Sequence, residues 1–134
     1  MDAFYHSISS AKMFGGQPED YYPVHAWFDR SKATFADFRH RALSHHAEGI
    51  QEAINHFGPY IVNSQGVKVP VRRIGERHIA EDLGRIPSLR DWFSLIKPER
   101  WMSPPSHLLF RDEKLDHLLA EQKSRKNTDK TTGD

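Results

Sequence analysis

Glycine and proline divide this sequence into short segments, and their spacing limits the elements that the chain can form. Gly15-Gly16, Gly58-Pro59 and Gly84 each follow a stretch of helical periodicity, and glycine or proline in that place is typical of a helix end. Between them, apolar residues recur at intervals of three and four, which indicates amphipathic helices. The pattern predicts helices at residues 2–13, 19–31, 33–57, 71–83, 88–96 and 107–120.

Residues 60–71 break the helical pattern. Tyr60-Ile61-Val62 and Val67-Lys68-Val69 are rich in β-branched side chains, and Asn63-Ser64-Gln65-Gly66 lies between them, which is typical of a β-hairpin. A lone two-stranded hairpin is marginally stable, so we expect it to pack on the helices. The predicted fold class is therefore mainly α, a compact helical bundle with one small β-hairpin insert.

The length of 134 residues suits one domain of ordinary size. We expect a single helical domain over residues 1–120. Residues 121–134 are rich in Lys, Thr and Asp, a composition that predicts a disordered tail.

Composition and charge exclude several classes of protein. The formal net charge is +1, which gives no strong signal for nucleic-acid binding. The sequence has no cysteine, which excludes disulfides, thiolate zinc sites and cysteine nucleophiles. Residues 1–6 lack the basic segment and the apolar segment that are typical of a signal peptide. No apolar run reaches the roughly 18 residues that a membrane span needs. We expect a cytoplasmic protein that does not enter a membrane; the oligomeric state stays open.

Histidine is the unusual component. The chain has nine histidines, and five of them fall between residues 25 and 56, namely His25, His40, His45, His46 and His56. We expect the outlying His6, His107 and His117 at the surface.

Helical wheels place several polar residues on apolar faces. If residues 33–57 form one continuous helix, Arg39 and His46 lie two turns apart within the arc that contains Phe35 and Ile50. On helix 71–83, His78 and Asp82 lie one turn apart in the middle of the apolar arc. Asp82 also lies in the last turn, where the helix dipole disfavours an acid.

Helix 19–31 shows the same pattern at the edge of its apolar face, where His25 and Asp29 are spaced i and i+4. Burying an unpaired charge costs several kcal/mol. The polar residues of the three helices should therefore meet each other, a metal ion or a ligand.

Three interpretations follow. In the first, the residues form a structural network in which Asp82 pairs with Arg39. In the second, an imidazole and a carboxylate one turn apart share a divalent metal ion. Histidine and carboxylate ligands suit Zn, Mn, Fe or Ni, and a metal-bound water could hydrolyse a phosphoester or an amide. The predicted ligands are His46, His78 and Asp82, with His25 and Asp29 as further ligands and Arg39 as a charge partner. In the third, Arg39 and nearby arginines bind an anion.

Two motifs resemble a family of short uncharacterised bacterial and phage proteins. They are His-x-Trp-Phe-Asp at residues 25–29 and Arg-His-Arg-Ala-x-x-His-His at residues 39–46. The similarity extends over roughly residues 5–102. It implies a bacterial or phage cytosolic setting and no known activity, so the chain is not assigned as an enzyme.

The resemblance keeps a rival function open, a non-catalytic protein-interaction or inhibitor protein such as a phage counter-defence factor. Its polar core would then be structural, and the exposed aromatic residues Trp92, Trp101 and Phe110 would contact a protein partner.

Overall fold

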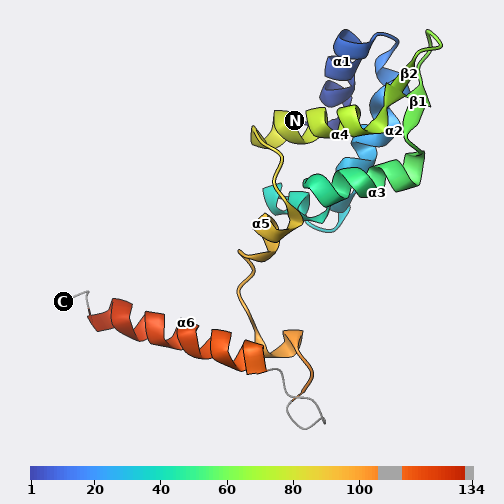
Figure 1. Ribbon diagram of the computed structural model, residues 1–134. Helices are drawn as coiled ribbons and strands as arrows, with labels where there is room; N and C mark the ends of the chain where they lie inside the picture. Colours follow the sequence, from blue (N-terminus) through green and yellow to red (C-terminus); the bar gives the residue numbers. More distant parts are fainter. Residues whose placement is uncertain (106–112, 132–134) are drawn as a thin grey trace. The chain divides into compact units, whose positions relative to one another are not determined.

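The computed structural model describes residues 1–105 and 113–131, and its fold is mainly α with a two-stranded antiparallel hairpin (Figure 1). The chain divides into two compact units, Met1–Ser94 and Leu95–Asp134. The single domain over residues 1–120 that we expect from chain length stays a prediction. None of the helices in the described ranges is long and apolar enough to cross a membrane.

The first unit contains the helices and strands that surround the histidines. Its α-helices are α1 (Ala3–Phe14), α2 (Pro18–Phe28), α3 (Ala47–Phe57), α4 (Val71–Leu83) and α5 (Leu89–Phe93). Two short 3-10 helices, η1 (Arg30–Ala33) and η2 (Phe38–Leu43), lie between α2 and α3. The hairpin strands β1 (Tyr60–Val62) and β2 (Lys68–Pro70) pair antiparallel with Ile61 opposite Val69. The predicted hairpin and the bounds predicted for helix 71–83 are therefore confirmed.

Helix ends follow local chemistry. The carboxylate of Asp2 accepts hydrogen bonds from the backbone amides of Phe4 and Tyr5 and so begins α1, as side-chain caps commonly do. Helix α4 ends at Gly84, whose φ of 73° lies in the left-handed region that glycine adopts without strain.

Residues 33–57 do not form the continuous helix that the pattern predicts. The chain leaves η2 at Leu43, and α3 begins only after His46, whose backbone is extended at φ −161° and ψ 169°. The His46 Nδ1 atom accepts a hydrogen bond of 2.9 Å from the amide of Gly49 and caps α3. A helical wheel therefore relates residues 47–57 to one another but not to residues 33–46, and Phe35, predicted in the core, is 44% exposed.

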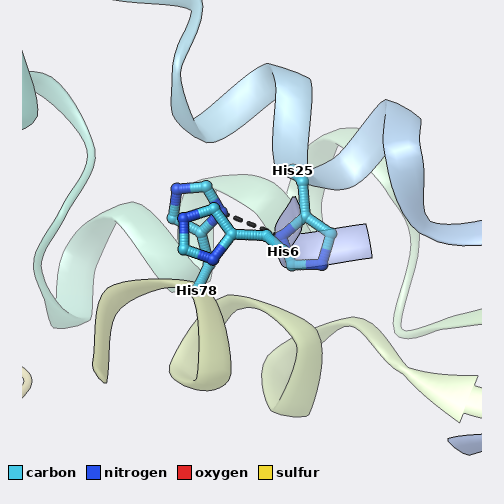
Figure 2. Close-up of side chains that lie close together, drawn as sticks. All are labelled: His6, His25 and His78. Carbon is cyan, nitrogen blue, oxygen red and sulfur yellow. Dashed lines mark hydrogen bonds between the residues drawn. The ribbon is translucent and has the colours of Figure 1, made fainter. Parts of the chain in front are cut away.

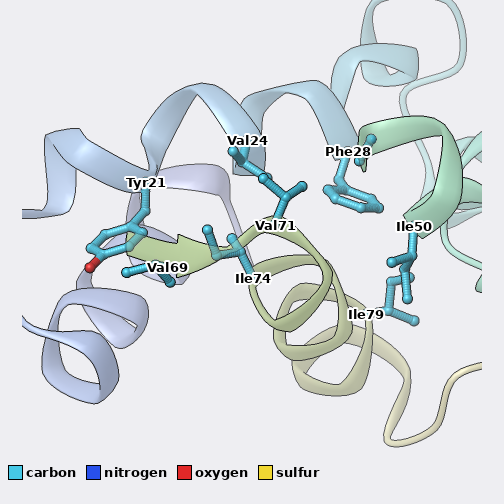
Figure 3. Close-up of a cluster of buried hydrophobic side chains, with 9 residues drawn as sticks. Tyr21, Val24, Phe28, Ile50, Val69, Val71, Ile74 and Ile79 are labelled. Carbon is cyan, nitrogen blue, oxygen red and sulfur yellow. The ribbon is translucent and has the colours of Figure 1, made fainter. Parts of the chain in front are cut away.

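The apolar core lies mainly between α2 and α4 (Figure 3). The side chains of Tyr21, Val24 and Phe28 on α2 face those of Val71, Ile74 and Ile79 on α4, and Ile50, Ala53 and Val69 complete the cluster. A Cβ atom on Gly75 would lie 2.8 Å from Cζ of Phe28, so glycine permits the close approach of α4 to α2. Polar side chains on the facing sides of these helices are consequently enclosed.

The second unit contains the 3-10 helix η3 (Arg100–Met102) and the helix α6 (Glu113–Thr131). Of the helix predicted at 107–120, residues 107–112 lie outside the described residues and the remainder belongs to α6. Helix α6 also includes residues 121–131, for which we expected a disordered tail. Glu, Gln, Lys and Arg are frequent there and have high helix propensity, so a polar composition does not prevent a local helix.

Candidate metal centre

Three segments of the first unit bring two carboxylates and two imidazoles together. Asp29 follows the last residue of α2, His45 lies in the turn before α3, and His78 and Asp82 are one turn apart on α4. Their side chains are between 0% and 7% exposed. The site therefore depends on the packing of α2 against α4 and on the segment between η2 and α3.

The four side chains point toward a common centre. His45 Nε2 lies 2.9 Å from Asp82 Oδ2 and 3.7 Å from Asp29 Oδ1. His78 Nε2 lies 3.2 Å from Asp29 Oδ1 and 3.4 Å from Asp82 Oδ2. One ligand atom from each of the four residues lies within 4.8 Å of the others. Each imidazole thus turns Nε2, and each carboxylate one oxygen, to the same point.

Four of the six spacings among these ligand atoms are close to the edge length of a tetrahedral metal site. With bonds of about 2.0–2.2 Å to nitrogen and oxygen, tetrahedral ligand atoms lie about 3.4 Å apart. The four nitrogen–oxygen distances, 2.9, 3.2, 3.4 and 3.7 Å, lie on both sides of that value.

The outer oxygens of both carboxylates face cations. Asp82 Oδ1 lies 3.1 Å from His6 Nε2, 3.4 Å from the Met1 ammonium and 3.7 Å from Arg41 Nη2. Asp29 Oδ2 lies 3.6 Å from Lys32 Nζ. Burial opposes ionisation of Asp82, but its hydrogen bonds with His45 and His6 outweigh burial and hold the pKa of Asp82 far below the usual range.

The pKa of Asp29 is also lowered: burial opposes ionisation, but the hydrogen bond with His78 and the charges of His78, Lys32 and His45 together outweigh it. Both carboxylates of the cluster are therefore negative in neutral solution, although both are buried.

Burial makes two of the imidazoles neutral. It lowers the pKa of His78 to about 4, and burial together with the charges of His78 and His6 lowers the pKa of His25 to about 2. A neutral imidazole is the form that binds a metal ion. His6 differs, because the hydrogen bond and charge of Asp82 and of Glu81 outweigh its burial and raise its pKa.

His6, His25 and His78 form a second group of histidines (Figure 2). His25 projects from α2 and His78 from α4, and their Nδ1 atoms are 2.8 Å apart in a hydrogen bond. His25 Nε2 forms a 2.7 Å hydrogen bond with Ser10 Oγ. The His6 ring lies with its centroid 3.9 Å from that of His78.

His6, His25 and His78 also have ligand atoms within 4.8 Å of one another. Both nitrogens of His6 are bonded to carboxylates, however, at 3.2 Å to Glu81 and 3.1 Å to Asp82. The Asp29, His45, His78 and Asp82 group, called the carboxylate site below, is therefore the better candidate to hold a metal ion.

Unpaired buried atoms gather at the carboxylate site. Within the described part of the chain, the buried side-chain atoms without a hydrogen-bond partner are Asp29 Oδ2, Arg41 Nε, His45 Nδ1 and Ser103 Oγ. The first three belong to ligands of the site or to the cation beside it. Buried polar atoms are normally paired, and an unpaired one is costly. These three atoms surround the four centre-facing atoms and are not among them, so the unpaired groups lie around the centre of the site.

The structure brings together three of the five predicted ligands, His78, Asp82 and Asp29. His25 lies behind His78 and contacts it through Nδ1. His46 lies elsewhere, because it caps α3 and its Nε2 contacts the carbonyl oxygen of Leu43 at 3.0 Å.

Arg39 was predicted in the core as a partner of Asp82, and this is wrong. Its side chain is 65% exposed and forms a forked ion pair with Asp37. Arg41, two residues later, lies beside Asp82. The prediction for Arg39 failed for the same reason as that for His46, because residues 38–43 form a separate 3-10 helix and do not continue the helical spacing of α3.

The sequence interpretation missed His45 and His6. His45 lay at the edge of the arc on the continuous wheel, and His6 was expected at the surface although it is 0% exposed. The available signal for His6 was its i and i+4 spacing to Ser10, which repeats the spacing of His25 to Asp29. His117 is 75% exposed as expected, and His107 lies outside the described residues.

The aromatic residues proposed for a partner surface differ from one another. Trp92 Nε1 donates a 2.9 Å hydrogen bond to the carbonyl oxygen of His45 and so supports the main chain of the carboxylate site. Trp101 is 79% exposed, and Phe110 lies outside the described residues. Trp92 thus supports the fold, whereas the side chain of Trp101 lies mostly in solvent.

The chain belongs to a family described as a domain of unknown function, DUF6915, which matches residues 1–102. All residues of the carboxylate site, together with His6, Ser10 and His25, lie within the matched range. Comparison with curated proteins and with solved structures found no match. The bacterial or phage origin expected from the sequence stays a prediction.

Proposed function

We propose that this member of a family without an assigned activity binds one divalent transition-metal ion at the carboxylate site. The ligand atoms would be Asp29 Oδ1, His45 Nε2, His78 Nε2 and Asp82 Oδ2. The observation that carries the proposal is the set of four nitrogen–oxygen distances between 2.9 and 3.7 Å, which fits the edges of a tetrahedron around an ion.

The donor set favours particular metals. Imidazole nitrogens with carboxylate oxygens suit Zn, Mn, Fe and Ni, and the tetrahedral spacing favours Zn among them. Two carboxylates of lowered pKa would balance the charge of a divalent ion. The two imidazoles would bind it without adding charge.

The proposed ion has a structural role. Four protein ligands fill a tetrahedral shell, whereas a catalytic zinc keeps a position for water or substrate. The ligand side chains are at most 7% exposed, and the surface pocket beside Glu81 and Arg77 includes none of them among its lining residues. Hydrolysis of a phosphoester or an amide is therefore not part of the proposal; the ion ties α2, α4 and the turn before α3 together.

Elemental analysis of protein purified without a histidine tag tests the proposal. We expect about one ion per chain, in line with one tetrahedral site, and loss of that ion in His45→Ala. The matched control is His46→Ala, because His46 is equally buried and adjacent but caps α3. The control should keep the ion. Absence of metal from the unaltered protein, with no thermal stabilisation by added zinc, would contradict the proposal, as would equal loss in both variants.

A non-catalytic protein-interaction or inhibitor role is the second candidate function. It is favoured by the exposure of large apolar side chains in the second unit, where Leu95 is 82% and Trp101 is 79% exposed, since such side chains often mark interaction sites. A partner captured by the unaltered protein should be lost by Trp101→Ala at unchanged metal content. Equal capture by Trp101→Ala would count against this surface.

A further inference from the structure

Behind the carboxylate site, a chain of two hydrogen bonds leads from His78 through His25 to Ser10. His78 and His25 are joined through their Nδ1 atoms at 2.8 Å, and His25 Nε2 is 2.7 Å from Ser10 Oγ. All three side chains are fully buried and come from α4, α2 and α1. The other ring nitrogen of His78, Nε2, faces the carboxylate site.

We infer that His25 and Ser10 are positioning residues, which hold His78 with Nε2 directed at the metal ion and set the ring nitrogen that carries its proton. This inference rests on the proposed function. Histidine ligands generally donate their second ring N–H to a nearby acceptor, which fixes the orientation and tautomer of the ring. Here that acceptor is His25, whose own second ring nitrogen forms a hydrogen bond with Ser10.

The hydrogen-bond chain permits two arrangements of its protons. Without an ion, His78 Nε2–H donates to Asp29 Oδ1 at 3.2 Å, so His78 Nδ1 must accept. His25 Nδ1–H then donates to His78, and Ser10 Oγ–H donates to His25 Nε2. With an ion on His78 Nε2, the direction reverses, because His78 Nδ1–H donates to His25 Nδ1, and His25 Nε2–H donates to Ser10 Oγ.

The number of protons on the three side chains is three in both arrangements. Metal loading therefore moves the proton of each imidazole to its other nitrogen without changing the charge of either ring. The tautomer of His25, which does not touch the ion, reports whether the ion is bound at His78. A purely structural His25 would keep its tautomer.

His6 is not part of the hydrogen-bond chain from His78 through His25 to Ser10. Both of its nitrogens are bonded to the carboxylates of Glu81 and Asp82. A second ion held by His6, His25 and His78 would require these bonds and the His25–His78 hydrogen bond to break. The inference therefore predicts one ion per chain and not two.

The first test is nitrogen NMR of the full chain with labelled histidines, with zinc alone as the added probe. In metal-free protein we expect His25 to carry its proton on Nδ1, and after addition of one equivalent of zinc on Nε2. An unchanged His25 tautomer would overturn the inference, as would binding of two zinc ions per chain.

The second test compares serine variants on α1. Loss of a group bonded directly to a metal ligand weakens metal binding roughly 10- to 100-fold; Ser10 bonds His78 only through His25, so Ser10→Ala should weaken zinc binding by about the lower end of that range, and Ser10→Thr should restore it by returning the hydroxyl. The matched control is Ser7→Ala, because Ser7 is equally buried on the same helix but bonds the carbonyl of Ala3. Equal zinc affinity in Ser10→Ala and unaltered protein would overturn the inference alone. Absence of zinc binding by the unaltered protein would overturn the proposed function with it.

Discussion

His45 and His46 are adjacent and both buried, yet only His45 faces the carboxylates. The extended backbone of His46 turns its side chain back onto α3, where it caps the helix. Sequence reasoning chose His46 because a wheel at 100° per residue places it in the apolar arc, and that spacing holds only within a helix. The structure thus places His45, and not the predicted His46, beside Asp29 and Asp82.

At the residue scale, the buried neutral histidines predict a loss of stability in mild acid. In metal-free protein the pKa values of His78 and His25 are lowered, to about 4 and about 2, from about 6.5 in the unfolded chain. Below pH 6.5 the unfolded state therefore binds more protons than the folded state. The contribution of these two histidines to the free energy of unfolding is at its maximum above pH 6.5 and is lost as the pH falls toward 4.

Urea unfolding of metal-free protein at several pH values measures this slope. His25→Phe should reduce it, because the ring is kept and the titrating group is removed, whereas His117→Phe, at an exposed position, should leave it unchanged. The raised pKa of His6 has the opposite effect. Its contribution to the free energy of unfolding is at its maximum below pH 6.5 and is lost as the pH rises through the pKa of His6 in the folded protein. A free energy of unfolding that increases from pH 6.5 to pH 4 would contradict the account.

At the scale of elements, α4 and α2 could be predicted, and the break before α3 could not. Helix α4 has a local start at Pro70 and a local stop at Gly84, so its wheel correctly places His78 and Asp82 inside. The break depends on distant residues. Ser44 Oγ donates to the carbonyl of Phe28, and the amide of Ala47 donates to the carbonyl of Pro87. No local pattern encodes these two hydrogen bonds.

Gly49 packs closely against Ser44 in the break between η2 and α3. A Cβ atom on Gly49 would lie 1.9 Å from the carbonyl oxygen of Ser44, so Gly49→Ala must displace the turn that carries His45. Alanine gains about 1 kcal/mol in helix propensity, but overpacking costs about 1–3 kcal/mol, and we expect net destabilisation together with weaker zinc binding.

Chemical denaturation and a zinc titration of Gly49→Ala measure both effects. Gln51→Ala, at an exposed position of the same helix, is the control and should keep stability and zinc affinity. A Gly49→Ala protein that is more stable than the unaltered one would show that Ser44 does not lie against α3.

At the scale of the whole molecule, composition and periodicity were sufficient for the fold class. The predicted mainly α fold with a β-hairpin is confirmed. The boundary at Ser94 and Leu95 was not predicted, because helix propensity and apolar spacing describe local structure and do not count the contacts between elements. Helix α6 includes residues 121–131, whose polar composition predicts disorder.

Zinc should stabilise the molecule if the carboxylate site binds it only when folded. At a free zinc concentration about 1,000 times the Kd, binding adds about 4 kcal/mol to the free energy of unfolding. Each kcal/mol raises Tm by roughly 4–8 °C in a unit of the size of Met1–Ser94, which carries the site. Calorimetry with zinc and with a chelator measures the difference, and magnesium, which prefers oxygen ligands, is the control. An equal Tm with zinc and with chelator would contradict binding to the folded state.

Anomalous diffraction from zinc-loaded crystals, recorded at the zinc absorption edge, shows where the proposed ion lies among its four ligand atoms. We expect a single strong peak in the first unit, about 2.0–2.2 Å from Asp29 Oδ1, His45 Nε2, His78 Nε2 and Asp82 Oδ2. A peak among His6, His25 and His78, or no peak within bonding distance of His45, would contradict this expectation.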